Sequence, residues 1–197
     1  MKILFVTSNQ NKINEAKILF NELDYSVEGL KINGKLPNFI EPQSNNLEVV
    51  AVSKLKQAVS LLKNNNLEEY AILVEDSGLF IDKFSDFPGV FSSFVYDSIG
   101  LTGILNLLAN SINRSAEYRA VTILQWKNKI WKSSGVCKGT ISNKELGEGG
   151  FGYDPIFIPL EGDGSTFSQM SNIEKSLISH RSNSLRGLLD SLKHPSK

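Results

Sequence analysis

Four short segments, far apart in the sequence, carry residue types that could handle a metal-bound phosphate. They are residues 7–12 (Thr-Ser-Asn-Gln-Asn-Lys), 75–78 (Glu-Asp-Ser-Gly), 150–155 (Gly-Phe-Gly-Tyr-Asp-Pro) and 179–181 (Ser-His-Arg). The first follows an apolar run and opens a helical pattern, and the second places two carboxylates side by side. The other two add aromatic rings and cations. Small polar groups, carboxylates and cations are what a magnesium–nucleotide complex requires.

The first segment, residues 7–12, is a candidate anion site. A strand that leads into a helix leaves backbone N–H groups unpaired at the positive end of the helix dipole, and these groups can bind an anion. Ser8, Asn9 and Lys12 could add side-chain contacts. The alternative is that Thr7 or Asn9 only caps the helix while Lys12 is solvated.

The adjacent carboxylates of Glu75 and Asp76 come at the end of a predicted apolar strand. Burying two such charges costs several kcal/mol, on the order that isolated buried ions cost, unless a cation is present. Mg²⁺ uses one or two carboxylates together with waters and substrate phosphates, which suits this pair. The alternative is an acidic surface turn, with Ser77 and Gly78 in the turn positions.

The glycine-rich segment matches the dinucleotide fingerprint G-x-G-x-x-G at Gly147, Gly149 and Gly152. That fingerprint requires a strand before it and a helix after it, whereas a proline and a strand-like run follow here. We therefore interpret the segment as a turn that presents the ring faces of Phe151 and Tyr153 to a base, with Asp154 as a hydrogen-bond acceptor. The alternative is a glycine-lined turn whose aromatic residues belong to the core.

The cationic segment begins the last predicted helix. His180 and Arg181 could bind a base carbonyl or a phosphate, and Lys175 lies about one helical turn before them. A lone histidine can equally be structural. The sequence contains no Walker motif, no G-x-S-x-G and no Cys/His cluster, so it predicts neither a P-loop, nor a serine hydrolase, nor a zinc site.

The periodicity of apolar residues predicts the elements that position these segments. Strands are expected over residues 2–7, 25–32, 71–74 (with 79–81 as a continuation), 118–126, 130–136 and 155–159. Helices are expected over residues 12–23, 47–62, 101–111 and 185–192. Asn45 or Asn46 is the expected N-cap of the second helix, Asn128-Lys129 the expected hairpin turn, and residues 171–174 a capping box. Alternating strands and helices predict one α/β or α+β domain over residues 1–197, built around a mixed sheet.

The composition argues against a nucleic-acid-binding protein, a disulfide-bonded protein and a membrane protein. The 197 residues carry 21 Lys+Arg and 21 Asp+Glu, so a neutral chain has no overall field to attract nucleic acid. The single cysteine, Cys137, cannot form an intramolecular disulfide, which suits a reducing cytoplasm. No apolar run approaches the roughly 18 residues of a spanning helix, and the apolar run at the start is short for a signal peptide. We therefore expect a cytoplasmic protein that binds neither nucleic acid nor membrane.

Taken together and in this order, the four segments resemble the inosine triphosphate pyrophosphatase family, from Ile3 to about Leu189. Residues 151–155 and 179–181 are the most specific pieces, followed by residues 74–78 with 87–90. The resemblance implies Mg²⁺-dependent hydrolysis of deaminated purine nucleoside triphosphates (ITP, dITP and XTP) to the monophosphate and pyrophosphate. It also implies a homodimer and an elongated α/β fold, in which helices flank a mixed central sheet and two lobes surround a cleft.

Site residues follow from the resemblance, position by position. Asp76 would be a metal ligand and the general base, sharing the metal with Glu41 and with Glu75. The substrate would be bound by residues from every segment, namely Thr7, Ser8, Asn9, Gln10, Asn11, Lys12, Lys54, Ser77, Phe151, Gly152, Tyr153, Asp154, Lys175, His180 and Arg181.

Two alternative functions stay open at this point. One is a related pyrophosphatase that removes modified pyrimidine nucleotides, which the segments at 151–154 and 179–181 disfavour. The other is a catalytically silent nucleotide sensor. A sensor has no need of a metal ligand and a base, so the retained Glu75-Asp76 pair disfavours it.

Overall fold

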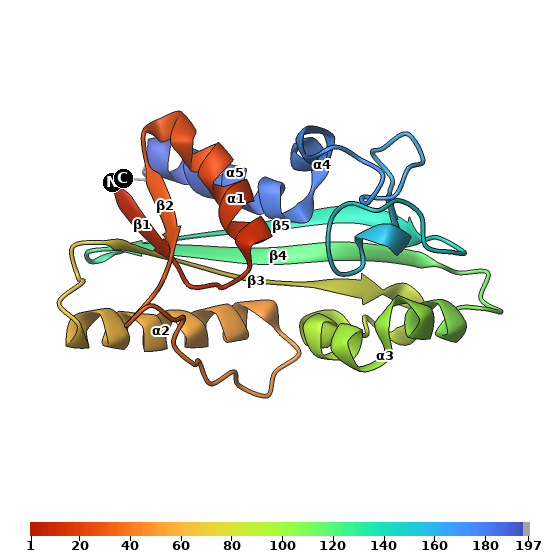
Figure 1. The fold of residues 1–197 in the computed structure, drawn as a ribbon, viewed down its shortest axis with the longest axis horizontal. Helices are drawn as coiled ribbons and strands as arrows, with labels where there is room; N and C mark the ends of the chain where they lie inside the picture. The colour runs from red at the N-terminus through yellow and green to blue at the C-terminus, as the bar shows by residue number, and fades with distance from the viewer. Residues whose placement is uncertain (195–197) are drawn as a thin grey trace. The chain divides into compact units, whose positions relative to one another are not determined.

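The computed structural model describes residues 1–194 of the chain. Within them, one sheet has the strand order β2-β1-β3-β4-β5-β6 (Figure 1). Its strands are β1 (Lys2–Phe5), β2 (Ser26–Gly29), β3 (Ala71–Ile81), β4 (Ser115–Trp126), β5 (Lys129–Ile141) and β6 (Phe157–Pro159). The α-helices are α1 (Gln10–Phe20), α2 (Leu47–Asn64), α3 (Ser92–Leu107), α4 (Asn172–Ile178) and α5 (His180–Lys193). Short 3₁₀ turns are η1 (Asn21–Leu23), η2 (Asp82–Phe84), η3 (Gly89–Phe91) and η4 (Asp154–Ile156).

The sheet is mixed. Strand β1 pairs in parallel with both β2 and β3, whereas β5 and β6 are antiparallel. Helices alternate with the strands, so the predicted α/β class with a mixed sheet flanked by helices is confirmed. The predicted elongation, the two lobes and the cleft stay predictions.

The chain divides into two compact units. Unit 1 comprises residues 1–76, 121–134 and 184–197, and unit 2 comprises residues 77–120 and 135–183. Strands β3, β4 and β5 each contribute residues to both units. Each unit has its own buried core.

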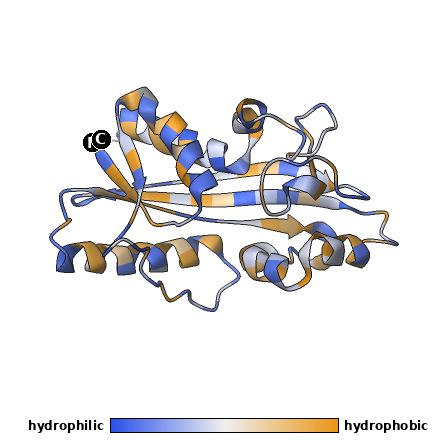
Figure 2. Ribbon diagram, viewed as in Figure 1, coloured by the Kyte–Doolittle hydropathy of each residue, from blue (hydrophilic) through white to orange (hydrophobic). Residues whose placement is uncertain are grey.

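The core of unit 1 lies on both faces of its part of the sheet, because successive strand residues point to opposite faces. Ile3 and Phe5 pack with α1 and α5, whereas Leu4 and Val6 pack with α2. Figure 1 shows α1 and α5 on one face and α2 on the other, and Figure 2 shows β1 as a hydrophobic strand. The same alternation in β3 sends Leu73 toward α1 and Val74 toward α2.

The core of unit 2 is rich in aromatic residues. Tyr118 from β4, Phe157 from β6, and Tyr153 and Phe167 from the connecting loops are all buried in it. They pack with aliphatic side chains of β3 and α3, including Leu79, Ile81, Val95 and Ile104. The segment at residues 150–155, which contains Tyr153, therefore lies in this core.

The predicted break after residue 74 is wrong, because β3 runs without interruption from Ala71 to Ile81. Gly78 is not a turn residue there. A Cβ at that position would collide with the backbone carbonyl of Gly89, so the glycine permits a close approach of two backbone segments. Glu75 and Asp76 consequently lie inside a strand and not at its end.

Other boundaries differ less. Helix α3 begins at Ser92, earlier than predicted, and is interrupted at Gly100, whose φ of 62° is not helical. The turn between β4 and β5 is formed by residues 127–128, one residue before the predicted position. The Asn46 N-cap and the capping box of Ser171 and Glu174 are confirmed.

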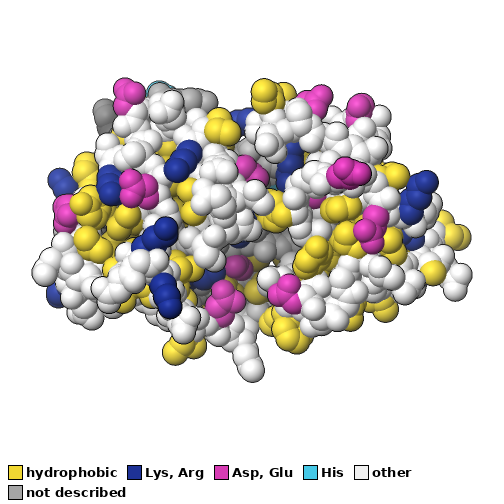
Figure 3. Space-filling view, viewed as in Figure 1, with side chains coloured by type: hydrophobic (Ala, Val, Ile, Leu, Met, Phe, Trp, Pro, Cys, Tyr) yellow, Lys and Arg dark blue, Asp and Glu magenta, His cyan; other side chains and the backbone are white. Residues whose placement is uncertain are grey.

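Helix α3 leaves much apolar surface exposed. Phe94 is 71% exposed, and Phe91, Ile99 and Leu107 are exposed as well. Figure 3 shows hydrophobic side chains on the surface over α3, at the lower right. The expectation that no apolar run approaches the length of a spanning helix is wrong, because residues Gly89–Leu107 are long and apolar enough to cross a membrane by length and composition, and only 17% of that stretch is buried. The break at Gly100 divides the stretch, which does not suit a continuous spanning helix.

Candidate active site

The segment at residues 7–12 forms the start of α1. The Asn9 side chain accepts hydrogen bonds from the backbone N–H groups of Asn11 (2.9 Å) and Lys12 (3.3 Å), and the Thr7 hydroxyl accepts one from the Asn9 N–H (3.1 Å). Asn9 is therefore the N-cap, as one part of the alternative predicted, whereas Lys12 is not simply solvated but forms an ion pair with Glu75. Ser8 and Asn11 are exposed beside it, and exposed Gln10 bonds to Asn14 at 2.8 Å.

Glu75 points to the α1 face of β3. Its carboxylate is buried, and the Lys12 ammonium lies 3.4 Å from its Oε1 atom. The pairing brings together two segments that the sequence placed 63 positions apart, because β1 leads directly into α1 beside β3. Lys12 thereby places a cation at the start of α1, close to the helix N-terminus.

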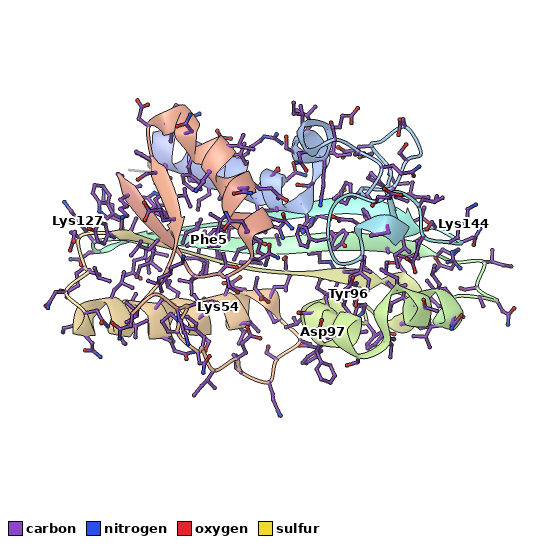
Figure 4. The ribbon with its side chains drawn as sticks, viewed as in Figure 1. Phe5, Lys54, Tyr96, Asp97, Lys127 and Lys144 are labelled. Atoms are coloured by element: carbon purple, nitrogen blue, oxygen red, sulfur yellow. The ribbon has the colours of Figure 1, made fainter. Side chains whose placement is uncertain are left out.

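Asp76 points to the opposite face, toward α2. The Lys54 ammonium lies 3.7 Å from Asp76 Oδ1 and 3.0 Å from Glu41 Oε1, so one lysine joins both carboxylates. Figure 4 places Lys54 on the side of α2 that faces the sheet. Gln57, one turn further along α2, exchanges hydrogen bonds of 2.8 and 2.7 Å with the backbone of Ile40. Those bonds hold the loop that carries Glu41 against α2.

The surroundings of Asp76 disfavour the charged form of its carboxyl group. Burial raises the pKa of its carboxyl to about 6, although Lys54 and Lys12 oppose the rise, and Glu41 and Glu75 add to it. Its Oδ2 atom is buried and has no hydrogen-bond partner among residues 1–194. A buried carboxylate oxygen without a partner is costly, and such a site favours a proton or a cation beside it.

The predicted three-carboxylate metal site is not preformed. Within residues 1–194, no three Asp, Glu, His or Cys side chains converge closely enough to hold a metal ion. The reason is strand geometry, because Glu75 and Asp76 are consecutive in β3 and therefore face opposite ways. Glu41 and Asp76, both beside Lys54, remain together on the α2 face.

In unit 2, Asp154 and Lys175 form a buried ion pair. Lys175 Nζ lies 2.6 Å from Asp154 Oδ2, and the two side chains are 8% and 4% exposed. The same carboxylate oxygen accepts the Phe151 backbone N–H at 2.8 Å. Gly150 has a φ of 72°, and a Cβ there would collide with this carboxylate. Asp154 thus closes the glycine-rich turn, which also contains Gly152 at a φ of 60°.

Phe151 is half-buried and lies beside two cations. Lys175 Nζ is 4.8 Å from its ring centroid and Arg181 Cζ is 5.5 Å from it, both within the range of cation–π attraction. Arg181 is buried, and one of its nitrogens lies 3.5 Å from the hydroxyl of Ser77. Unit 2 therefore gathers an aromatic ring, two cations and a serine hydroxyl.

The prediction that Tyr153 presents its ring to a base is wrong for this structure. Tyr153 is 3% exposed, its ring packs edge-on against Tyr96 at 5.4 Å, and its hydroxyl donates to the Ser92 carbonyl at 2.8 Å. The alternative of a core aromatic holds for this residue. Asp154, the predicted acceptor for a base or sugar, is likewise buried and engaged within the protein.

Two residues next to these segments were missed by the sequence analysis. Ser92 Oγ contacts the Leu79 N–H (2.8 Å) and the Gly89 carbonyl (2.6 Å) while its own carbonyl accepts from Tyr153. Tyr118 packs directly on the ring of His180. Neither residue stands in a motif, so local sequence gave no signal for them.

The predicted site residues thus fall into two groups. We call the set in unit 1 the carboxylate–lysine cluster; it contains Lys12, Glu41, Lys54, Glu75 and Asp76. We call the set in unit 2 the aromatic–cation cluster; it contains Ser77, Phe151, Asp154, Lys175 and Arg181. Next to the latter, Tyr153 and buried His180 belong to the core side of the same segments.

Sequence comparisons match this chain to known proteins over nearly its whole length. A profile described as the Ham1 family matches residues 3–191. The chain is 40% identical to the dITP/XTP pyrophosphatase of Pyrococcus horikoshii over 193 residues, which are 98% of this chain and 97% of that protein. It is 39% identical to the protein of the same name from Thermococcus kodakarensis, over 98% of each chain.

Solved structures agree as well. The fold is similar to that of the Staphylococcus aureus Ham1 protein, with a TM-score of 0.83 and 29% identity over the full length of both chains. It is also similar to that of a HAM1 protein from Coxiella burnetii, with a TM-score of 0.80 and 27% identity over 98% of each chain.

Proposed function

The chain belongs to the Ham1 family, and we propose that it hydrolyses the triphosphates of deaminated purines, namely ITP, dITP and XTP, to the monophosphate and pyrophosphate. The observation that carries the proposal is full-length similarity, at 40% identity over 98% of the chain, to a protein named dITP/XTP pyrophosphatase. The resemblance to nucleotide pyrophosphatases that the motifs indicated is confirmed, and the enzyme is a hydrolase of nucleoside triphosphates.

The carboxylate–lysine cluster supplies the chemistry in this proposal. Asp76 orients a water molecule for in-line attack on the α-phosphorus and accepts its proton. The new bond joins the water oxygen to the α-phosphorus, and the bond to the pyrophosphate oxygen breaks. A carboxylate whose pKa is about 6 is a stronger base than an ordinary aspartate, and it is still ionised at neutral pH. Lys12 and Lys54 neutralise phosphate charge, and residues 7–11 line the start of α1 where phosphate would bind.

Asp76 and Glu41 are the residues that would hold Mg²⁺, with Glu75 a further candidate on the other face of β3. The partnerless Oδ2 atom of Asp76 fits this role, since a hard cation seeks carboxylate oxygen. When bound, the ion supplies charge neutralisation for the triphosphate and the departing pyrophosphate. Mg²⁺ needs only one or two carboxylates besides water and phosphate, so a set of three protein ligands is not required.

The aromatic–cation cluster, together with the buried His180 next to it, supplies base recognition in this proposal. Phe151 offers a ring face, Lys175 and Arg181 offer donors, and His180 offers an imidazole to the carbonyl at purine position 6. Adenine has an amino group at that position, so a donor would face another donor. A mismatch of this kind in a polar site is worth ~10⁴-fold, whereas a small steric difference is worth only ~10–200-fold. We expect ATP to be rejected strongly and GTP less strongly.

The proposed enzyme is a cytoplasmic homodimer that binds neither nucleic acid nor membrane. The exposed apolar residues of α3 support a protein partner, because large apolar side chains gathered on one part of a surface mark an interaction site (Figure 3). Sedimentation velocity of the wild type and of Phe94→Glu tests the dimer. A wild-type monomer at micromolar concentration would contradict it.

A substrate panel tests the activity. Purified protein with Mg²⁺ is incubated separately with ITP, XTP, dITP, ATP, GTP and dTTP, and the products are resolved by ion-exchange chromatography, with Asp76→Asn as the inactive control. IMP or XMP together with pyrophosphate is expected. A diphosphate with free phosphate would overturn attack at the α-phosphorus, and a preference for pyrimidines would overturn the substrate class. Tight binding without product would identify a sensor instead.

A further inference from the structure

Tyr118 lies in β4, outside every motif of the sequence, yet its ring stacks on the ring of His180. The two centroids are 4.5 Å apart, and the ring planes differ by only 8°. Both residues are buried, Tyr118 at 8% and His180 at 4% exposure. The contact is therefore a parallel stack inside the core of unit 2.

The surroundings of Tyr118 hold its ring in place. Phe157 packs against it edge-on at 4.7 Å, and Phe167 lies nearly parallel to it at 6.0 Å. Tyr153, in the glycine-rich turn, belongs to the same buried core as Tyr118. Tyr118 therefore stacks on residue 180 of the segment 179–181 and shares its core with Tyr153 of the segment 151–154, the two segments that the proposed function assigns to base recognition.

We propose that Tyr118 is a positioning residue that fixes the plane of the His180 imidazole and thereby sets the discrimination between a 6-carbonyl and a 6-amino purine. The inference rests on the proposed function, because it assigns a task within the base recognition that this function gives to residues of unit 2. Tyr118 acts through His180 and needs no contact with substrate.

The physical reason lies in the geometry of the imidazole. Its N–H groups point outward in the plane of the ring, so the ring plane decides where they can donate. The χ2 torsion of histidine has a broad minimum, so the side chain alone does not fix that plane. A hydrogen bond weakens steeply when its angle falls below about 120°. The ring of Tyr118, whose plane differs by 8° from that of His180, restricts the rotation of the imidazole. An imidazole N–H with a fixed direction can distinguish a carbonyl from an amino group at purine position 6.

Two variants at position 118 separate the ring from the hydroxyl. Tyr118→Leu removes the stacked ring, whereas Tyr118→Phe keeps the ring and removes only the hydroxyl group. Ile104→Ala is the matched control, since Ile104 is fully buried in the same core and belongs to neither base-reading segment. Each variant is assayed for kcat and KM with ITP and with ATP, and its Tm is measured.

We expect Tyr118→Leu to lower the ITP-to-ATP ratio of kcat/KM at least ~10-fold, part of the ~10⁴-fold that a polar mismatch can provide. Tyr118→Phe should keep the ratio within about 3-fold of the wild type, because it retains the ring that this mechanism requires. Ile104→Ala should lower Tm and leave the ratio unchanged. A parallel loss with both substrates in Tyr118→Leu would show a structural role only and overturn the proposal.

A spectroscopic test does not depend on turnover. The chain has two histidines, so ¹³C-labelled histidine gives two sets of ring signals, and His194 in the tail serves as the reference. IMP should shift the His180 signals of the wild type and of Tyr118→Phe, and shift those of Tyr118→Leu much less. If wild-type protein shows no preference for ITP, the proposed function fails by itself. Identical His180 signals and IMP shifts in Tyr118→Leu and wild type would overturn the role of Tyr118.

Discussion

The two clusters differ in how fully hydrogen bonds and cations within the protein compensate their buried carboxylates. In the aromatic–cation cluster, the Asp154 carboxylate is satisfied twice within the protein, by Lys175 at 2.6 Å and by the Phe151 N–H at 2.8 Å. In the carboxylate–lysine cluster, Asp76 has its nearest cation at 3.7 Å, an oxygen without a partner within residues 1–194, and a pKa raised to about 6.

This difference indicates a division of labour. Satisfied, buried charges fix a geometry, which a site that recognises a base requires. A carboxylate with few hydrogen bonds and no close cation can still accept a proton or bind a cation. Hydrolysis requires a group with this property. Residues of the first kind should mainly affect folding and KM when changed, and residues of the second kind should mainly affect kcat.

The largest effect on stability is expected from Lys175→Met. The substitution leaves the Asp154 carboxylate buried without its cation, which costs about 3–5 kcal/mol when one partner of a buried pair is removed. Urea unfolding followed by circular dichroism measures the loss. Lys144→Met, at an exposed lysine of the same unit, is the control and should change stability little. The double variant Asp154→Asn/Lys175→Met should recover part of the loss, and an additive loss would contradict the pairing.

The next largest effect is expected on catalysis from Asp76→Asn. Removal of the general base should lower kcat for ITP at least ~10²-fold, the lower end of such effects. Steady-state kinetics with pyrophosphate detection measures it, and Asp190→Asn, at an exposed aspartate of α5, is the control. A variant with near-wild-type kcat would remove Asp76 from the role of base.

The same substitution should stabilise the metal-free protein. The folded-state pKa of Asp76 is raised from 3.8 to about 6, so the folded state binds the proton more tightly than the unfolded state. Ionisation of Asp76 therefore lowers the free energy of unfolding. This loss is absent below about pH 4 and complete above about pH 6. Asp76→Asn removes this loss, and we expect a gain of about 1–2 kcal/mol at pH 8, discounted from 1.36 kcal/mol per pKa unit for partial solvation.

Unfolding in chelator at pH 8 and at pH 4 measures that gain. The difference between variant and wild type should be present at the higher pH and vanish at the lower one. An equal difference at both pH values would show that the charge of Asp76 is not its source.

The sequence predicted most members of both clusters from residue type, because a cation and a carboxylate each have a restricted set of physical uses. Glu41 and Lys54 followed only from the resemblance to the family. The sequence also predicted the Asn46 cap and the capping box of Ser171 and Glu174, since helix caps are local. The sequence did not predict that Glu75 and Asp76 face opposite sides of one continuous strand, because the polar residues 75–77 and Gly78 interrupt the apolar pattern. Gly78 is required by the close approach of the backbone of Gly89, which lies 11 residues away in sequence.

Burial of individual aromatic residues was also beyond the sequence. Phe151 and Tyr153 differ little as residue types, yet one is half-buried beside two cations and the other is enclosed in the core of unit 2. Tyr153 packs against Tyr96 and donates its hydroxyl hydrogen bond to the carbonyl of Ser92, 61 positions away in sequence. Contacts of this range depend on the fold, and no local pattern encodes them.

The smallest effect is expected from Tyr153→Phe, which tests the assignment of this residue to the core. The change removes the hydrogen bond to the Ser92 carbonyl and should cost about 1 kcal/mol of stability, the typical net value of one such bond. Because the ring remains, KM for ITP should change less than about 3-fold, since a bond made within the core adds little to binding. Urea unfolding and steady-state kinetics measure the two quantities. A large rise in KM with unchanged stability would instead return the Tyr153 hydroxyl to the surface that contacts substrate.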